Sequence, residues 1–258
     1  MAPPVFHLAE LPAAGSVAVL AGPEGHHAAT VRRMRVGQRL LLADGRGGVA
    51  DCTVTASGRD RLDLAVTGLR FVPAATPPVT VMQALPKSER SELAVELATE
   101  AGADVVVPWQ AARCVARWQG GGADGGRAER GVRRWRSAAT QAAKQSRRAY
   151  VPVVHDVHTT AEVAGLVRAA VAGAGVALLL HESATVGLAR AQVSGAASVL
   201  LVVGPEGGLA DDELAVLTAA GAAAVHLGPT VLRTSTAAAV ALGALGVLTG
   251  RWDVPPLR

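Results

Sequence analysis

The sequence contains few cysteines and no clear metal-binding pattern. Its 258 residues include only Cys52 and Cys114, which lie far apart in the chain. Two isolated cysteines exclude a disulfide framework and a zinc finger, and they are typical of a protein from a reducing compartment. His155 and His158 have a spacing that suits a metal, but no further ligands stand beside them. We therefore interpret this pair as part of a surface loop and expect no metal.

Long hydrophobic runs and a targeting segment are also missing. No apolar stretch approaches the roughly 20 residues that a membrane-spanning helix needs. The N-terminus lacks the basic and then apolar pattern of a secretory signal. Aromatic residues make up 3% of the chain, whereas hydrophobic residues make up half of it and charged residues 18%. This composition favours a folded core over disorder. We expect a soluble, cytoplasmic protein without a membrane partner.

Lysine is almost absent, because Lys87 and Lys144 are the only lysines among 25 basic residues. An arginine bias can reflect genome composition, so arginine content alone does not indicate nucleic acid. The distribution of charge is more informative. Residues 113–148 contain ten basic and two acidic residues, a net charge of +8, whereas the whole chain carries +4 and the remainder therefore −4. Such a basic block indicates a polyanion partner. The alternative is a solvated helix face.

The first part of the chain reads as short strands joined by turns. Residues 16–20 and 38–43 are strand-like, and Asp44–Gly48 has the composition of a hairpin turn before two further alternating segments. A helical stretch over residues 26–35 interrupts the strands. The pattern predicts a small β-rich domain, a β-barrel, over residues 1–72.

A linker rich in Pro, Ala and Thr over residues 73–78 precedes a different pattern. Continuous apolar strands, such as residues 79–85 and 197–203, alternate with helices from there on. This alternation predicts an α/β domain over residues 79–258, with a parallel sheet covered by helices on both faces. The glycine-rich residues 120–126 are expected to form a surface insertion.

The tetrapeptide Gly-Pro-Glu-Gly occurs twice, at residues 22–25 and 204–207. The second copy follows a long apolar strand, and ligands bind at the carboxyl ends of strands in parallel α/β sheets. Its glycines and Gly208 allow a sharp bend and a close approach of a ligand. Asp211 and Asp212 in the following helical turn disfavour a phosphate. The sequence therefore predicts a neutral or zwitterionic ligand held mainly by backbone groups. The first copy is interpreted as a turn that starts a helix.

A second loop of the same kind spans residues 227–237. It runs from a strand end through Gly-Pro into a helix, where Thr234, Ser235 and Thr236 offer capping hydroxyl groups. Arg233 stands just before these hydroxyl groups. An arginine there is either structural or bound to a substrate.

Together these motifs resemble the RsmE family of the SPOUT superfamily, methyltransferases that act on N3 of a uridine in small-subunit ribosomal RNA. VGPEGGLADDEL (203–214) and LGPTVLRTSTA (227–237) resemble the family's two C-terminal motifs. HAATVRRMRVG (27–37) is similar to the His-x-x-x-Val-Leu-Arg segment of its PUA-like domain. Residues 85–113 and 134–152 resemble two further segments, so the likeness covers nearly the whole chain.

The resemblance implies a PUA-like RNA-binding barrel followed by a SPOUT domain with a deep trefoil knot, a rare exception to unknotted folds. It also implies a homodimer and S-adenosylmethionine as cofactor. The cofactor would be held by three loops, whose residues are Leu180, His181, Glu182, Val203, Gly204, Pro205, Gly207, Gly208, Leu227, Gly228, Val231, Leu232, Thr234 and Thr236.

The implied substrate is 16S rRNA, within the assembled small ribosomal subunit. We assign Arg233 to stabilise the charge that develops on uracil and Glu206 to accept the N3 proton; alternatively, Glu206 shapes its own loop. RNA phosphates would be bound by basic residues of both domains and one glutamine. These are Arg32, Arg33, Arg35, Lys87, Arg113, Arg133, Arg134, Arg136, Lys144, Gln145, Arg147 and Arg148.

The chain departs from the family pattern at Arg32 in place of Leu, Leu97 in place of Lys, Thr230 in place of Arg and Ser235 in place of Glu, and no Arg precedes Val5 and Phe6. Two other functions stay open at this point. The first is a non-enzymatic RNA-binding factor of ribosome assembly, and the second is a SPOUT methyltransferase with another RNA target. A test of cofactor binding distinguishes the assembly factor from an enzyme. Mapping of the methylated atom distinguishes a methyltransferase with another target from one that acts on N3 of uridine.

Overall fold

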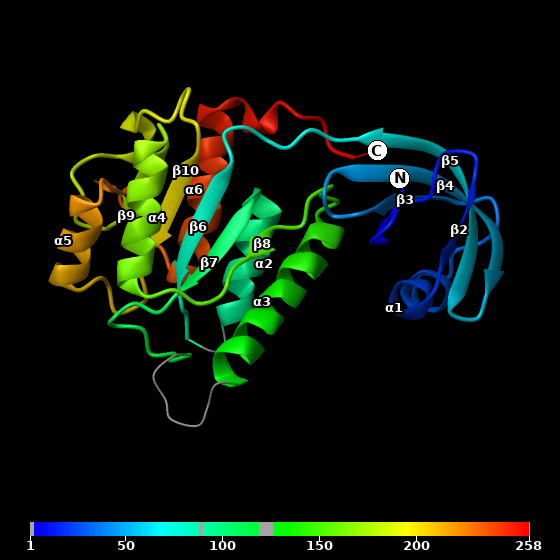
Figure 1. The fold of residues 1–258 in the computed structure, drawn as a ribbon, viewed down its shortest axis with the longest axis horizontal. Helices are drawn as coiled ribbons and strands as arrows, with labels where there is room; N and C mark the ends of the chain where they lie inside the picture. Colours follow the sequence, from blue (N-terminus) through cyan, green and yellow to red (C-terminus); the bar gives the residue numbers. More distant parts are fainter. Residues whose placement is uncertain (1–2, 88–89, 119–125, 258) are drawn as a thin grey trace. The chain divides into compact units, whose positions relative to one another are not determined.

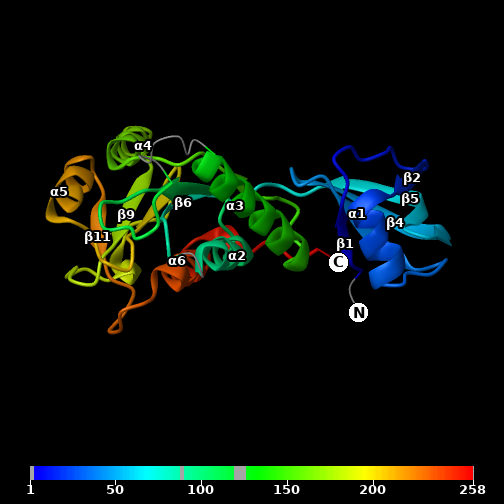
Figure 2. The ribbon, with the colours of Figure 1, turned by 90° about the horizontal axis from the view of Figure 1, so that it is seen from below.

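The computed structural model describes residues 3–87, 90–118 and 126–257 (Figures 1 and 2). The chain divides into two units. The first comprises Met1–Ala74, Ala143–Val151 and Pro256–Arg258, and the second comprises Ala75–Ala142 and Pro152–Pro255. The expected glycine-rich insertion lies outside the described residues except for Gly126, which starts a helix. No helix in the described ranges combines the length and apolar character needed to cross a membrane.

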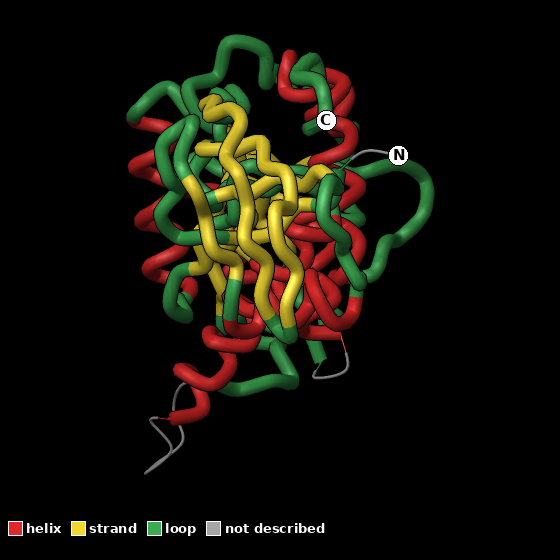
Figure 3. Tube along the Cα trace, turned by 90° about the vertical axis from the view of Figure 1, so that its right-hand side faces the viewer, coloured by secondary structure: helices red, strands yellow, loops and turns green. Residues whose placement is uncertain are grey.

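The first unit is built on a five-stranded sheet with the order β1-β3-β4-β5-β2. Its strands are β1 (Val5–His7), β2 (Val17–Leu20), β3 (Arg39–Ala43), β4 (Gly48–Gly58) and β5 (Arg61–Phe71). β1 is parallel to β3 and the other pairs are antiparallel, with the strands drawn in yellow in Figure 3. β1 and β2 are the edges and do not pair, so the described strands form a half-barrel rather than the closed barrel expected. The three-residue β1 is too short to give an alternating pattern and was not predicted.

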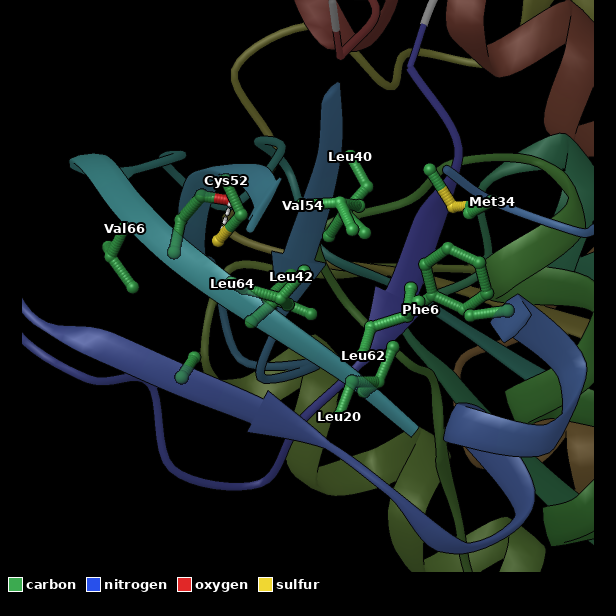
Figure 4. Packing of buried hydrophobic residues seen from close by; sticks show 13 residues of the cluster. Phe6, Leu20, Met34, Leu40, Leu42, Cys52, Val54, Leu62, Leu64 and Val66 are labelled. Carbon is green, nitrogen blue, oxygen red and sulfur yellow. Dashed lines mark hydrogen bonds between the residues drawn. The ribbon is translucent and has the colours of Figure 1, made fainter. Parts of the chain in front are cut away.

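The core of this unit comes from the alternation of its strands. Leu62, Leu64 and Val66 of β5 belong to one cluster of buried side chains with Leu40 and Leu42 of β3 (Figure 4). Successive side chains of a strand point to opposite faces, so every second residue enters this cluster. The apolar alternation read from the sequence therefore corresponds to one buried face of the sheet.

The first Gly-Pro-Glu-Gly copy starts a helix, as predicted. Helix α1 (Gly22–His26) has Pro23 in its first turn, where the missing N–H of proline is tolerated. It continues into a turn of π-helix, η1 (His27–Val31). The helical segment therefore begins earlier and ends earlier than the residues 26–35 expected, because Arg33 adopts a left-handed conformation with φ 52°.

Glu24 of this copy anchors two other segments of the first unit. Its Oε1 lies 2.6 Å from Nζ of Lys144, and its Oε2 accepts the backbone N–H of His7 at 3.1 Å. Both side chains of the ion pair are largely buried. Burial alone would raise the pKa of Glu24, but the hydrogen bonds from Lys144 and His7 outweigh it and hold the pKa below its usual value. Lys144, assigned to RNA from the sequence, is thus paired within the protein.

The Glu24 contacts make the first unit sensitive to acid. The pKa of Glu24 is lower in the folded than in the unfolded chain, so its stabilising contribution is present above the unfolded value of 4.5 and is lost as the pH falls through the folded value. We expect Glu24→Gln to lower the free energy of unfolding by roughly 1–3 kcal/mol at neutral pH. Below the folded pKa of Glu24, the difference from the wild type should shrink.

The measurement is amide hydrogen exchange of β3 to β5 as a function of pH, with Glu10→Gln as control because Glu10 is exposed. An equal loss of protection in both variants, or a difference that persists in acid, would contradict this role of Glu24.

The second unit contains a six-stranded sheet in which every pair is parallel, as predicted. The strand order is β11-β9-β10-β6-β7-β8. The strands are β6 (Val79–Ala84), β7 (Val105–Trp109), β8 (Val153–Val154), β9 (Val176–Leu180), β10 (Val199–Val203) and β11 (Ala223–Val225). All residues of β10 are buried, which explains its unbroken apolar sequence.

Helices cover both faces of this sheet. In Figures 1 and 2, α4 and α5 lie on one face, and α2 and α6 lie on the other. The helices are α2 (Ser91–Ala101), α3 (Gly126–Gln145), α4 (Thr160–Ala172), α5 (Asp211–Ala219) and α6 (Thr234–Leu248), with short 3-10 turns η3 (Leu188–Arg190) and η4 (Gly250–Trp252). A capping box formed by Thr159 and Glu162 is present at the start of α4. Helix α2 ends at Gly102, which adopts a left-handed conformation.

Arg251 in η4 is a buried arginine that sequence reasoning missed. Its guanidinium lies 3.0 Å from a carboxylate oxygen of Asp104 and donates to the carbonyl oxygens of Pro77 and Gly102, the latter at 2.6 Å. These groups belong to the segment before β6 and to the turn between α2 and β7. Arg251 therefore joins the end of the second unit to its beginning.

We expect Arg251→Met to lower the free energy of unfolding of the second unit by about 3 kcal/mol, because it removes the guanidinium that pairs with Asp104 and donates to the carbonyl oxygens of Pro77 and Gly102. Urea unfolding followed by tryptophan fluorescence checks this, since the four tryptophans all lie in the second unit. Arg168→Met on the exposed side of α4 is the control. Equal midpoints for the two variants would show that the Arg251 contacts contribute nothing.

Candidate active site

A cavity of about 570 Å³ opens at the carboxyl edge of the parallel sheet. Its walls come from the ends of β9 and β10 and from the segment between β11 and α6. Its lining residues are Arg113, Leu180, His181, Glu182, Val203, Gly204, Pro205, Glu206, Gly207, Gly208, Leu209, Val231, Leu232, Arg233, Thr234 and Ala237. A smaller pocket of about 120 Å³ shares some of these residues, Leu180 to Glu182 among them. The volume of the larger cavity is in the range typical of small-molecule sites.

Most of the residues predicted to hold a cofactor line the larger cavity, and Arg233 and Glu206 line it as well. Leu227 and Gly228 instead line the smaller pocket. Thr236 lines neither, because its hydroxyl group donates to the carbonyl oxygen of Arg233 at 3.1 Å and closes the first turn of α6. The hydroxyl of Thr236 is therefore bonded within the first turn of α6 and does not line the cavity.

The loop of the second Gly-Pro-Glu-Gly copy requires its glycines. Gly208 has φ 71°, a conformation that glycine adopts without strain. A Cβ atom on Gly207 would lie 3.2 Å from Cβ and from the carbonyl oxygen of Arg113. The loop is therefore packed against the segment that carries Arg113, and a large side chain at Gly207 would force the two apart.

A buried chain of hydrogen bonds supports this loop. Thr234 at the start of α6 donates its hydroxyl to the carbonyl oxygen of Gly204 at 2.5 Å. The same hydroxyl oxygen accepts from Nε2 of Gln83 in β6 at 3.1 Å. Gln83 is 1% exposed, and its Oε1 has no hydrogen-bond partner among the described residues. Sequence reasoning missed Gln83, although an amide within an apolar strand was a visible signal.

Glu206 and Arg113 form two further hydrogen bonds that fix the loop of residues 204–208. Oε1 of Glu206 accepts the backbone N–H of Lys87 at 3.1 Å, and the guanidinium of Arg113 donates to the carbonyl oxygen of Gly207 at 3.3 Å. The contact of Glu206 is of the loop-shaping kind that the sequence left open. Lys87 takes part in this contact through its backbone N–H, and the residue is exposed.

The charges around the cavity are mixed. Glu182 and Glu206 supply carboxylates, and Arg113 and Arg233 supply guanidinium groups. This set fits a zwitterion that carries both a carboxylate and positively charged groups, since each charge of the ligand meets an opposite charge on the protein. The described residues contain no group of three or more His, Cys, Asp or Glu that could hold a metal ion.

The predicted RNA-binding residues are distributed over both units. In the first unit, Arg32, Arg33 and Arg35 are exposed after η1, and Arg147 and Arg148 are partly exposed after α3. Gln145 is exposed as well. On the second unit's part of α3, three exposed arginines make surface ion pairs: Arg133 with Glu129, Arg134 with Glu92 and Arg136 with Asp156. Surface pairs of this kind contribute at most about 1 kcal/mol, so these arginines can exchange carboxylates for phosphates.

Both cysteines are buried, and burial raises the pKa of Cys52 and of Cys114 to about 11. Cys114 follows Arg113 directly, and its thiol lies 3.8 Å from the carbonyl oxygen of Trp109. Access of a reagent to the Cys114 thiol therefore measures whether the segment beside the cavity moves away from the protein interior.

Family models match both parts of the chain. The model described as RNA methyltransferase domain matches residues 74–246, and the model described as RNA methyltransferase PUA domain matches residues 20–67. The two family models together define the class of the chain as RNA methyltransferases.

Known proteins place the chain more narrowly. It is 58% identical over 249 residues to the ribosomal RNA small subunit methyltransferase E of Mycobacterium tuberculosis, which covers 96% of this chain and 93% of that protein. The Bacillus subtilis protein of the same name is 30% identical, with 89% and 90% covered. The chain belongs to the ribosomal RNA small subunit methyltransferase E family.

A solved structure shows the same fold. The Neisseria gonorrhoeae ribosomal RNA small subunit methyltransferase E, bound to S-adenosyl methionine, matches with a TM-score of 0.84 at 23% identity, over 96% of this chain and 98% of that one. This chain therefore shares its fold with that solved structure.

We expect neither cysteine to react with a thiol reagent in the native protein at pH 8, because a thiol with a pKa of about 11 is almost entirely protonated there. Both should react after unfolding in urea. Labelling kinetics of the wild type and of Cys52→Ala and Cys114→Ala measure this. Fast labelling of Cys114 in folded protein would mean that the segment beside the cavity opens freely.

Proposed function

We propose that this protein transfers a methyl group from S-adenosylmethionine to N3 of a uridine in 16S rRNA, within the small ribosomal subunit. The observation that carries the proposal is the cavity at the carboxyl edge of the sheet, with a glycine loop and both signs of charge in its walls. Membership of the ribosomal RNA small subunit methyltransferase E family supports it.

The residues of the cavity suit this cofactor. The backbone of Leu180–Glu182, of Gly204–Gly208 and of the segment before α6 would hold the adenosine part, and the mixed charges would meet its zwitterionic methionine part. S-adenosylmethionine supplies a methyl group that its sulfonium already activates. The protein is left with binding, orientation and the handling of one proton.

Arg233 and Glu206 would perform the two remaining tasks, which are charge stabilisation on the uracil and removal of its N3 proton. Arg233 lines the cavity and stands before the first turn of α6, where its guanidinium would stabilise the negative charge that develops on the uracil oxygens. Oε1 of Glu206 accepts the N–H of Lys87, which leaves Oε2 to accept the N3 proton. We therefore propose that Glu206 uses one oxygen atom to hold the loop and the other to accept the proton.

The RNA would be bound through its phosphates by the exposed arginines of both units, with Lys87, Arg113 and Gln145. Lys144 is left out, because its ammonium group is paired with Glu24. The target uridine must be looped out of its helix to reach the cavity. Such a substrate places the protein in the cytoplasm.

The finer architecture is also a proposal. We place the PUA-like domain at residues 1–72, the linker at 73–78 and the SPOUT domain at 79–258, with a deep trefoil knot and a homodimer. The hydrogen bonds of Thr234 to Gly204 and to Gln83 hold the start of the last helix against the earlier glycine loop and β6, a proximity that such a knot requires.

The cofactor test is calorimetric titration with S-adenosylmethionine. The wild type should bind it, and Gly207→Trp should not, because the new side chain collides with the Arg113 segment. Gly165→Trp is the control, since a Cβ there meets no atom within 4 Å. A folded wild type that binds no cofactor would favour an RNA-binding assembly factor.

The reaction test uses small ribosomal subunits that lack the modification. Methylation at N3 blocks the pairing edge of uracil, so reverse transcription should stop at one new uridine. Arg233→Ala should lower kcat by about 10²–10³-fold, a far larger factor than any change in the Kd for the cofactor. A methyl group on a ribose oxygen or on another base atom would overturn the N3 assignment.

A further inference from the structure

Glu213 is a buried carboxylate that the mechanism does not use. It lies in the first turn of α5 and is 4% exposed. Its Oε1 accepts the backbone N–H of Ala112 and the hydroxyl of Thr160, both at 2.8 Å. Its Oε2 accepts the backbone N–H of Ala210 at 3.2 Å. One side chain thus holds three segments, which follow β7, β8 and β10.

The charge of Glu213 has no cationic partner among the described residues. A buried carboxylate is stable only where donors satisfy it, and here two backbone N–H groups, one hydroxyl and the N-terminal end of α5 do so. Removing any donor leaves a desolvated charge, so the arrangement tolerates little movement. The three segments are therefore fixed relative to one another.

Each of these segments leads to the cavity. Ala210 ends the glycine loop, whose residues form one wall. Ala112 precedes Arg113, whose guanidinium lines the cavity and donates to the carbonyl oxygen of Gly207. Thr160 also accepts Nε1–H of the buried Trp109 at 3.1 Å, which ties the carboxyl end of β7 into the same network.

We propose that Glu213 is a positioning residue of the methyltransferase site. It holds the Arg113 segment against the glycine loop, and it thereby keeps the cavity in the shape that binds the cofactor. This proposal rests on the proposed function only for the identity of the ligand, S-adenosylmethionine.

Glu213→Gln tests the proposal with little change of volume. An amide has one acceptor and one donor end, so in either orientation its NH₂ group faces an N–H that the carboxylate accepted. We expect amide exchange of Ala112 or Ala210 to accelerate and the Kd for S-adenosylmethionine to rise about tenfold. Asp211→Asn is the matched control, since it removes the same charge from an exposed position in the same turn.

Thr160 provides a second test in case Glu213→Gln fails to fold. Thr160→Val removes the hydroxyl that donates to Glu213 and accepts from Trp109, whereas Thr160→Ser retains it. Thr160→Val should weaken cofactor binding, and Thr160→Ser should bind like the wild type. A merely structural role would change the melting temperature without this split in Kd.

The outcomes are distinguishable. Equal Kd values and equal exchange of Ala112 and Ala210 in the wild type, Glu213→Gln and Thr160→Val would overturn the positioning role. A wild type that binds no S-adenosylmethionine would instead overturn the proposed function. In that case the exchange rates, which need no cofactor, still decide whether Glu213 holds the two segments.

Discussion

The parallel sheet of the second unit imposes the constraint on which the site depends. Parallel strands end at one edge, so the loops after β9 and β10 and the segment after β11 meet there without being close in sequence. The strands are buried on both faces and mainly apolar, with Gln83 of β6 as an exception. The loops therefore supply the recognition groups, and the hydrogen bonds behind them decide how accurately these groups are placed.

Those supporting bonds have a common form. Thr234, Glu206 and Glu213 each use a side-chain oxygen to bond a backbone group of a loop, at Gly204, Lys87 and Ala210 respectively. A loop held in this way keeps its peptide groups oriented even though it has no regular secondary structure. The glycines then provide room, and the polar side chains provide the rigidity that glycine lacks.

Sequence patterns could predict the parts of this structure that depend on neighbouring residues. The unbroken apolar run of β10, the capping box at Thr159 and the glycine loop all have local signals, and the motif order identified the family. The Glu24–Lys144 pair and the Gln83–Thr234 bond could not be predicted, because they join residues separated by 120 and 151 positions. The three-residue β1 was too short to show a period, and Glu213 looked like one more acidic residue at a helix start.

The first unit is formed by segments that are far apart in the sequence, and this affects the order in which it can fold. The last strand of its sheet ends at Phe71. However, a further cluster of buried residues around Leu41 and Val49 includes Ala149, and Glu24 forms its ion pair with Lys144. During synthesis the chain emerges from its N-terminus. The N-terminal sheet thus leaves the ribosome with part of its core uncovered, and it must wait until the segment from Lys144 to Ala149 has been made. A chain terminated after the linker would lack these contacts and would expose apolar surface to other nascent chains.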